Sequence, residues 1–69
     1  MNKFYVIVRG YDISYDNYIV DGYWIEGNDI EEIKEKAKWE FCCTYNVQWR
    51  YITVKKVLDE NFLRVPRNI

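Results

Sequence analysis

The segment NDIEEIKEKAKWEF, residues 28–41, predicts the one helix of the chain. Asn28 is expected to cap this helix, with Glu31 three residues further on, as in a capping box. The helix is expected to end between residues 43 and 46. Apolar or small residues recur at the 3.6-residue spacing of one helix face, which is the face expected to meet a sheet. These residues are Ile30, Ile33, Ala37, Phe41 and Thr44.

Trp39 departs from this stripe. At about 100° per residue it lies on the opposite side of the helix, among charged side chains. An exposed tryptophan on a polar face lowers solubility unless another group packs on it. Two interpretations stay open: a loop or tail of the same chain packs on it, or it anchors another chain, a role in which tryptophan is enriched.

Two strands are predicted before the helix. In residues 3–9, KFYVIVR, the apolar residues Phe4, Val6 and Val8 share one face and the residues between them share the other. Residues 18–27 return as the second strand of a hairpin whose turn is expected near residues 15–17. The pair DG at 21–22 predicts a bulge or kink at Gly22, and a second tight turn there is the rival interpretation.

A third strand is predicted over residues 47–58, VQWRYITVKKVL, and a short fourth strand over residues 62–65, FLRV, ended by Pro66. The order β-β-α-β, with or without the last strand, predicts one α+β domain over residues 1–69. In this fold class a small antiparallel sheet carries one helix on one face.

Composition limits how such a domain is stabilised. A chain of 69 residues buries only about 60% of its unfolded surface. It has no histidine, and its two cysteines, Cys42 and Cys43, are adjacent, so neither a loop-closing disulfide nor a zinc site is expected. No metal and no cofactor are predicted. The stabilisers that remain are self-association into a homodimer or larger homo-oligomer, or the binding of a partner.

Catalysis is not expected either. A hydrolytic triad lacks its usual base, and the scattered glycines form no phosphate-binding loop. Cys42 and Cys43 fall at a helix C-terminus, where a reactive thiolate is not favoured. The sequence contains no recognisable signal peptide or membrane span, which together with the free thiols predicts a cytoplasmic protein without a membrane partner.

Residues 11–32 carry seven acids and no base, interleaved with five aromatic residues. Carboxylates spaced between tyrosines along an extended strand are typical of a face that fits the basic cleft of a partner protein. We therefore expect a non-catalytic protein-binding module. The predicted partner-binding residues are Asp12, Tyr15, Asp16, Tyr18, Asp21, Tyr23, Glu26 and Trp39.

Two alternatives belong to other classes. A strand face built from Trp49, Arg50, Tyr51, Lys55 and Lys56 suits a nucleic acid or a small ligand, because rings stack on bases and cations meet phosphates. A sequence pI of 5.3 argues against nucleic acid. The second alternative is a self-assembling structural subunit, in which the acidic hairpin of one chain meets the basic C-terminal half of the next.

The segment YWIEGNDIEEIKEKAKWEF, residues 23–41, resembles a pattern in small proteins of phages and mobile elements, where a strand ending in an acid leads straight into a capped helix. The usage of Ile, Lys, Asn and Tyr is similar to that of AT-rich genomes such as those of Firmicutes and their phages. The resemblance implies an inhibitor of a host defence or nucleic-acid-handling enzyme that acts by binding in the host cytoplasm.

Overall fold

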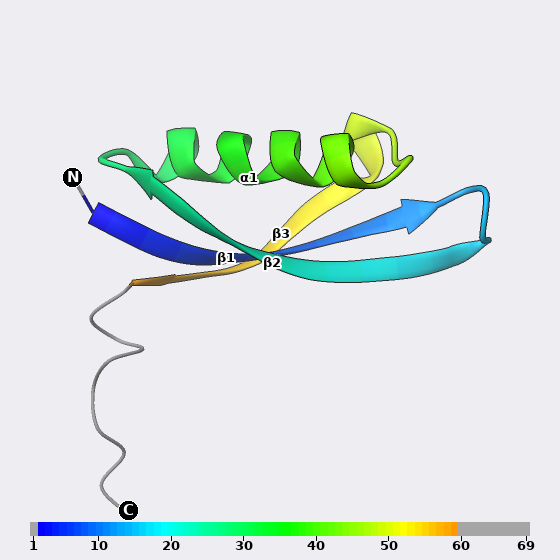
Figure 1. The fold of residues 1–69 in the computed structure, drawn as a ribbon, viewed down its shortest axis with the longest axis horizontal. Helices are drawn as coiled ribbons and strands as arrows, with labels where there is room; N and C mark the ends of the chain where they lie inside the picture. The colour runs from blue at the N-terminus through cyan, green and yellow to red at the C-terminus, as the bar shows by residue number, and fades with distance from the viewer. Residues whose placement is uncertain (1, 60–69) are drawn as a thin grey trace, which may run out of the picture.

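A computed structural model describes residues 2–59 of the chain (Figure 1). Strands β1 (Asn2–Asp12) and β2 (Asn17–Gly27) form a hairpin, and helix α1 (Ile30–Thr44) follows. A short 3-10 helix, η1 (Trp49–Tyr51), then leads into strand β3 (Ile52–Asp59). The predicted α+β class with the order β-β-α-β is confirmed, while the fourth strand predicted at 62–65 lies outside the described residues.

The three strands form one antiparallel sheet in the order β2-β1-β3. Since β2 and β3 both run antiparallel to the central β1, they run parallel to each other, and α1 is the crossover between them. Figure 1 shows α1 lying along one side of the sheet. The tip of the β1–β2 hairpin extends beyond β3, whose pairing with β1 stops at Gly10.

The core lies between α1 and the sheet face that β1 turns toward it. Val6 and Val8 from β1 and Ile33, Ala37 and Phe41 from α1 are fully buried. The alternation of β1 and the helical spacing of α1 therefore present matching apolar surfaces. Of the predicted helix stripe, the three central members are buried, whereas Ile30 and Thr44 at the two ends are exposed.

Gly10 lets the helix approach the sheet closely. A Cβ atom placed on Gly10 would lie 2.6 Å from Phe41 Cε1 and 3.0 Å from Val47 Cγ1. The absence of a side chain at this position is therefore what accommodates the Phe41 ring over β1.

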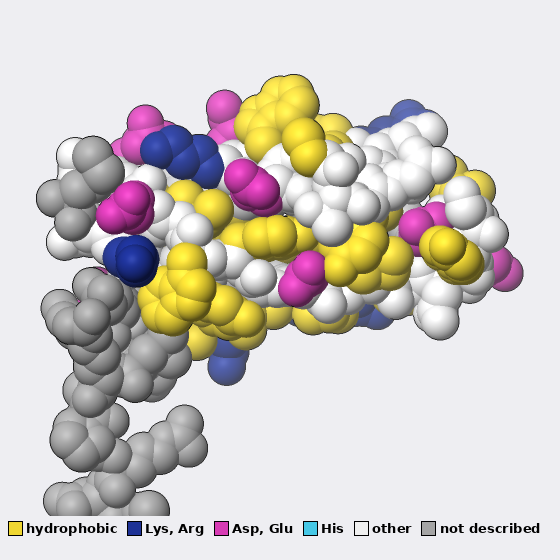
Figure 2. Space-filling model, in the orientation of Figure 1, with side chains coloured by type: hydrophobic (Ala, Val, Ile, Leu, Met, Phe, Trp, Pro, Cys, Tyr) yellow, Lys and Arg dark blue, Asp and Glu magenta, His cyan; other side chains and the backbone are white. Residues whose placement is uncertain are grey.

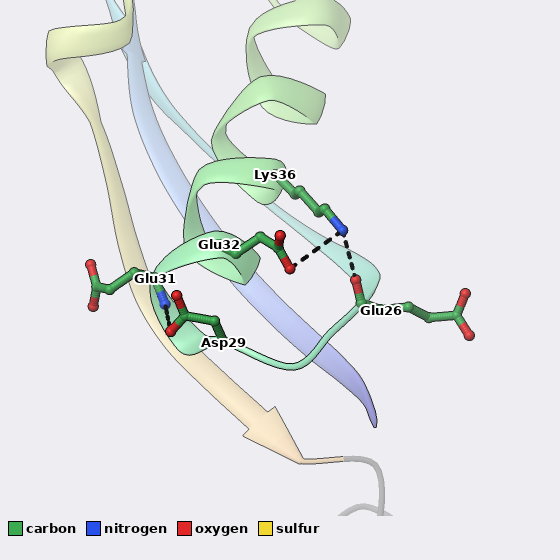
Figure 3. Close-up of polar contacts among 5 residues, drawn as sticks. All are labelled: Glu26, Asp29, Glu31, Glu32 and Lys36. Atoms are coloured by element: carbon green, nitrogen blue, oxygen red, sulfur yellow. Dashed lines mark hydrogen bonds and ion pairs between the residues drawn. The ribbon is translucent and has the colours of Figure 1, made fainter. Parts of the chain in front are cut away.

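The predicted N-cap is wrong by one residue. Asp29, not Asn28, has the extended backbone of a cap, and its carboxylate accepts a hydrogen bond from the Glu31 N–H at 3.3 Å (Figure 3). The Asp29 carbonyl also accepts from the Ile33 N–H at 2.9 Å. An aspartate carries a full negative charge to the positive end of the helix dipole, which an asparagine cannot do.

The predicted bulge at Gly22 and its rival, a second turn there, are both wrong. β1 and β2 pair without a register shift from Asn2↔Gly27 to Asp12↔Asn17, and the hairpin turn occupies residues 13–16, close to the prediction. Gly22 instead accommodates the Tyr5 ring, which a Cβ at this position would overlap. The only register shift recorded within the described sheet lies between β1 and β3, where Lys55 is the extra residue on β3.

The third strand begins later than predicted. Residues 47–51 are not a strand, because the chain must pass from the end of α1 to the edge of the sheet before it can pair with β1. Val47 is buried in the core, and η1 makes the turn with a 2.9 Å hydrogen bond from the Tyr51 N–H to the Gln48 carbonyl.

Candidate binding surface: the open face of the sheet

Within residues 2–59, no helix or strand covers the sheet face turned away from α1, which we call the open sheet face. Its residues follow from the alternation of the strands and their register. β1 contributes Lys3, Tyr5, Ile7, Arg9 and Tyr11, β2 contributes Tyr18, Val20, Gly22, Trp24 and Glu26, and β3 contributes Thr53, Lys56 and Leu58. Figure 2 shows hydrophobic side chains gathered along this lower side of the molecule.

Aromatic side chains pair across the two strands of the hairpin on this face. The rings of Tyr5 and Trp24 lie with centroids 5.1 Å apart, and those of Tyr11 and Tyr18 lie at the same separation in an edge-to-face arrangement. Both pairs are directly opposite in the register. Despite these contacts Trp24, Tyr18 and Val20 remain 51%, 56% and 60% exposed. Large apolar groups left this accessible on adjacent positions mark an interaction surface.

Cations lie on the same aromatic rings. The Arg9 guanidinium carbon is 3.9 Å from the centroid of the Tyr18 ring, and Lys3 Nζ is 5.9 Å from that of Trp24. Such contacts hold the cation near the ring while leaving its N–H donors free for another acceptor. The face therefore combines apolar contact area with positioned hydrogen-bond donors.

Near the hairpin tip the face has a hollow of about 340 Å³, lined by Tyr11, Ile13, Tyr18 and Tyr51. Tyr51 comes from η1, so this hollow brings together the tip of the hairpin and the segment that enters β3. It is lined by apolar and phenolic groups, as ligand and partner pockets commonly are.

Charge divides between the two sides of the molecule. The open sheet face carries three bases, Lys3, Arg9 and Lys56, against the single acid Glu26, a net of +2. The other described residues carry five bases against nine acids, a net of −4. The near-neutral total of the chain thus conceals a cationic sheet face and an acidic helix side.

The outer edge of β2 is occupied by side chains of the same chain. The Asp21 carboxylate accepts from the Gly22 N–H and the Asn17 side chain from the Tyr18 N–H, both at 2.8 Å. Lys36 Nζ donates to the Glu26 carbonyl at 3.1 Å and lies 3.8 Å from Glu32 (Figure 3). These groups obstruct the addition of another strand to β2, and the extra Lys55 disturbs the edge of β3. The face of the sheet is therefore more accessible to another molecule than these edges are.

The hairpin acids predicted to bind a partner do not share one surface. Asp12 is buried, and its carboxylate accepts from the Ser14 N–H at 2.8 Å in the hairpin turn. Asp21 lies on the helix side of β2, where the Tyr45 hydroxyl donates to it at 2.7 Å. Donation from Tyr45 and from the Gly22 N–H lowers the pKa of Asp21. Both carboxylates are thus engaged in holding the fold.

Tyr23 also lies on the helix side, opposite Val6. Burial is the largest cause that raises the pKa of its hydroxyl, and the nearby Asp21 carboxylate raises it further. The exposed members of the predicted set are divided among three places. Tyr18 and Glu26 lie on the open sheet face, Tyr15 and Asp16 lie at the hairpin tip, and Trp39 lies on the outer side of α1.

Trp39 is contacted by a loop of its own chain. The Trp49 ring of η1 lies 4.9 Å from the Trp39 ring, and Lys38 Nζ lies 5.5 Å from Trp49. Trp39 nevertheless stays 58% exposed, and Figure 2 shows a hydrophobic cluster above α1. Both interpretations of Trp39 therefore retain support: a partial cover from the same chain, and a ring available to another chain.

The predicted nucleic-acid or ligand face is likewise separated. Trp49 lies against the side of α1 with Lys34 and Lys38, Tyr51 and Lys56 belong to the open-face side, and Lys55 is the bulged residue. The Arg50 guanidinium is 5.1 Å from the Tyr51 ring. Tyr5, Ile7 and Arg9 fall on the outward face of the predicted first strand, and none of them is among the predicted site residues. The signal that could have found the site was that this outward face of the first strand is aromatic and cationic.

No family model, curated protein or solved structure matches this chain. Within residues 2–59 there is no helix with the length and apolar character needed to cross a membrane.

Proposed function

We propose that this chain is a non-catalytic protein-binding module that holds its partner against the open sheet face. The observation that carries the proposal is the exposure of Trp24, Tyr18 and Val20 on a face that no described element covers. Tryptophan, tyrosine and arginine are the residues most enriched among the anchors of protein interfaces. The blocked edge of β2 supports binding to the face over strand addition.

The form of this function that we favour is inhibition of a host defence or nucleic-acid-handling enzyme by occupation of a site. It is supported by the resemblance of residues 23–41 to small phage proteins and by the contact area that the exposed rings of the open sheet face offer. Binding would take place in the cytoplasm of the host. The partner binds to the open sheet face. It does not bind to the acids of the hairpin, because these do not share one surface.

Affinity capture with the tagged full chain tests this proposal. The bait is applied to a lysate of a low-GC Gram-positive bacterium beside two variants, the double variant Tyr18→Ala/Trp24→Ala and Trp39→Ala. All three changed side chains are more than half exposed, so the fold is expected to persist, and circular dichroism checks it. We expect a protein that is retained by the wild type and by Trp39→Ala but lost with the double variant.

The opposite pattern contradicts the proposal. If Trp39→Ala abolishes capture and Tyr18→Ala/Trp24→Ala does not, the binding surface is the outer side of α1. Activity assays of the captured enzyme with purified wild-type chain then distinguish an inhibitor from a passive ligand, because an inhibitor that occupies the site lowers the rate in a saturable way.

A further inference from the structure

We infer that the partner surface bound by the open sheet face is acidic, with carboxylates that pair with Lys3, Arg9 and Lys56. This inference rests on the proposed function and names the chemistry of its partner. It reverses the expectation drawn from the hairpin acids, which pointed to a basic cleft. The reason is that the register places the bases of β1 and β3 on the accessible face and turns Asp12 and Asp21 away from it.

The three bases are spread over the face. Lys3 and Arg9 lie six residues apart on β1, roughly 20 Å along the strand, and Lys56 lies on β3 opposite Ile7, between them. Arg9 is held against Tyr18 with its fork of donors available for a bidentate carboxylate. A partner that places carboxylates around an apolar centre would therefore meet both the bases and the rings.

Charge discriminates against the other occupants of this face. A second copy would bring a face of net +2 against a face of net +2, and like charges brought together across an interface are unfavourable. Residues 60–69 of the same chain contain two bases and one acid, a net of +1, so their charge does not complement the face either. An acidic surface on a different protein is the occupant that the charges favour.

The arrangement of the rings favours a protein over a nucleic acid. Base stacking needs free ring faces, but Arg9 lies over the Tyr18 ring, and the Tyr5 and Trp24 rings are tilted by 57° against each other. The exposed Val20 between the two aromatic pairs suits aliphatic side chains better than base planes. A long polyanion would also meet the net charge of −4 on the rest of the described chain.

The test is a titration of the ¹⁵N-labelled full chain at low salt, followed by amide chemical shifts. The probes are a random copolymer of Glu and Tyr, a random copolymer of Lys and Tyr, and a thymidine oligonucleotide. We expect the Glu/Tyr copolymer to shift the amides of β1 and β2 in a saturable way. Arg9→Glu/Lys56→Glu should weaken this binding by about tenfold or more, because two charge pairs become repulsive.

A matched control compares single charge reversals on the two sides of the molecule. Arg9→Glu should weaken the binding more than Lys38→Glu, which lies on α1 beside Trp49 and should leave the affinity within about threefold, since only long-range screening is altered. Equal losses in these two single variants would overturn the inference, because net charge alone would then explain the binding. Tighter binding of the oligonucleotide, no saturable response to the Glu/Tyr copolymer, or self-association through this face by sedimentation would each overturn it as well.

Failure of this inference and failure of the proposed function are distinguishable. If a captured partner is lost with Tyr18→Ala/Trp24→Ala but retained by Arg9→Glu/Lys56→Glu, the face binds a protein that is not recognised by its carboxylates. The proposed function then stands while the inference about its partner fails.

Discussion

The Tyr45 hydroxyl donates a 2.7 Å hydrogen bond to Asp21 Oδ2 and so joins the end of α1 to the edge strand β2 across 24 residues of sequence. The other oxygen of the same carboxylate accepts from the Gly22 N–H at 2.8 Å. The Asp21 side chain thus links the helix to the sheet and accepts a hydrogen bond from a backbone N–H at the sheet edge. The sequence suggests that Asp21 is part of a binding surface, but in the structure its carboxylate holds the helix and the sheet together.

Removal of the Tyr45 hydroxyl should raise the pKa of Asp21. Donation from Tyr45 is the largest cause of its lowered pKa, so Tyr45→Phe should move the pKa back toward its ordinary value of about 3.9. Side-chain carboxyl NMR of Asp21 against pH measures this change. Tyr51→Phe is the control, because this exposed tyrosine lies in η1, away from Asp21. An unchanged Asp21 pKa in Tyr45→Phe would contradict the role of the hydrogen bond.

The stability of the protein should fall at both ends of the pH range. Asp21 has a lowered folded-state pKa, so its contribution is present above the unfolded value of about 3.9 and is lost as the pH falls through the folded value. Tyr23 and Tyr45 have raised pKa values, so their contributions are present below about pH 10 and are lost as the pH rises through the folded values. Denaturant unfolding across pH tests both limbs, and Tyr45→Phe should flatten each of them.

Gly10→Ala should destabilise the fold by overpacking. The new methyl group would lie 2.6 Å from the Phe41 ring, which is itself fully buried, and such insertions cost about 1–3 kcal/mol. Gly27→Ala is the matched control, since its nearest neighbour is an Ile33 side-chain carbon at 3.0 Å, and it should cost less. Urea unfolding compares the two, and equal losses would mean that the helix does not press on β1 at Gly10.

Substitution by alanine should cost much more stability at Phe41 than at Trp39, although the two residues are only two positions apart on α1. Phe41→Ala removes a fully buried ring and should cost about 3–5 kcal/mol, enough to unfold a marginally stable small domain. Trp39→Ala removes an exposed ring that contacts Trp49 and should cost about 1 kcal/mol or less. Thermal melts followed by circular dichroism measure both. A larger loss in Trp39→Ala would show that the tryptophan pair is part of the core.

The helix cap provides a test at adjacent positions. Asp29→Ala removes the acceptor of the Glu31 N–H and should cost about 1 kcal/mol, within the range of about 0.5–2 kcal/mol for lost caps. Asn28→Ala should leave the free energy of unfolding within about 0.5 kcal/mol. If Asn28→Ala is the more damaging change, the helix begins one residue earlier in solution.

The helix and the first strand could be predicted because their signals are local. The spacing of Ile33, Ala37 and Phe41 and the alternation of Phe4, Val6 and Val8 each specify one buried face irrespective of the rest of the chain. The course of the chain at Gly22 and over 47–51 could not be predicted in this way. At Gly22 the pairing of eleven consecutive residues with β1 overrides a turn signal, and at 47–51 the connection to the sheet edge overrides strand propensity.

The fold class, the buried face of each main element and the surplus of acids in residues 11–32 follow from the order of the residues alone, because they depend on period and composition. Which charges a partner can reach depends instead on how the elements pack together. A side chain in a strand points to one face or the other, and a helix covers one of them. The register therefore turned Asp12 and Asp21 toward α1 and left Arg9, Tyr18 and Trp24 on the open sheet face.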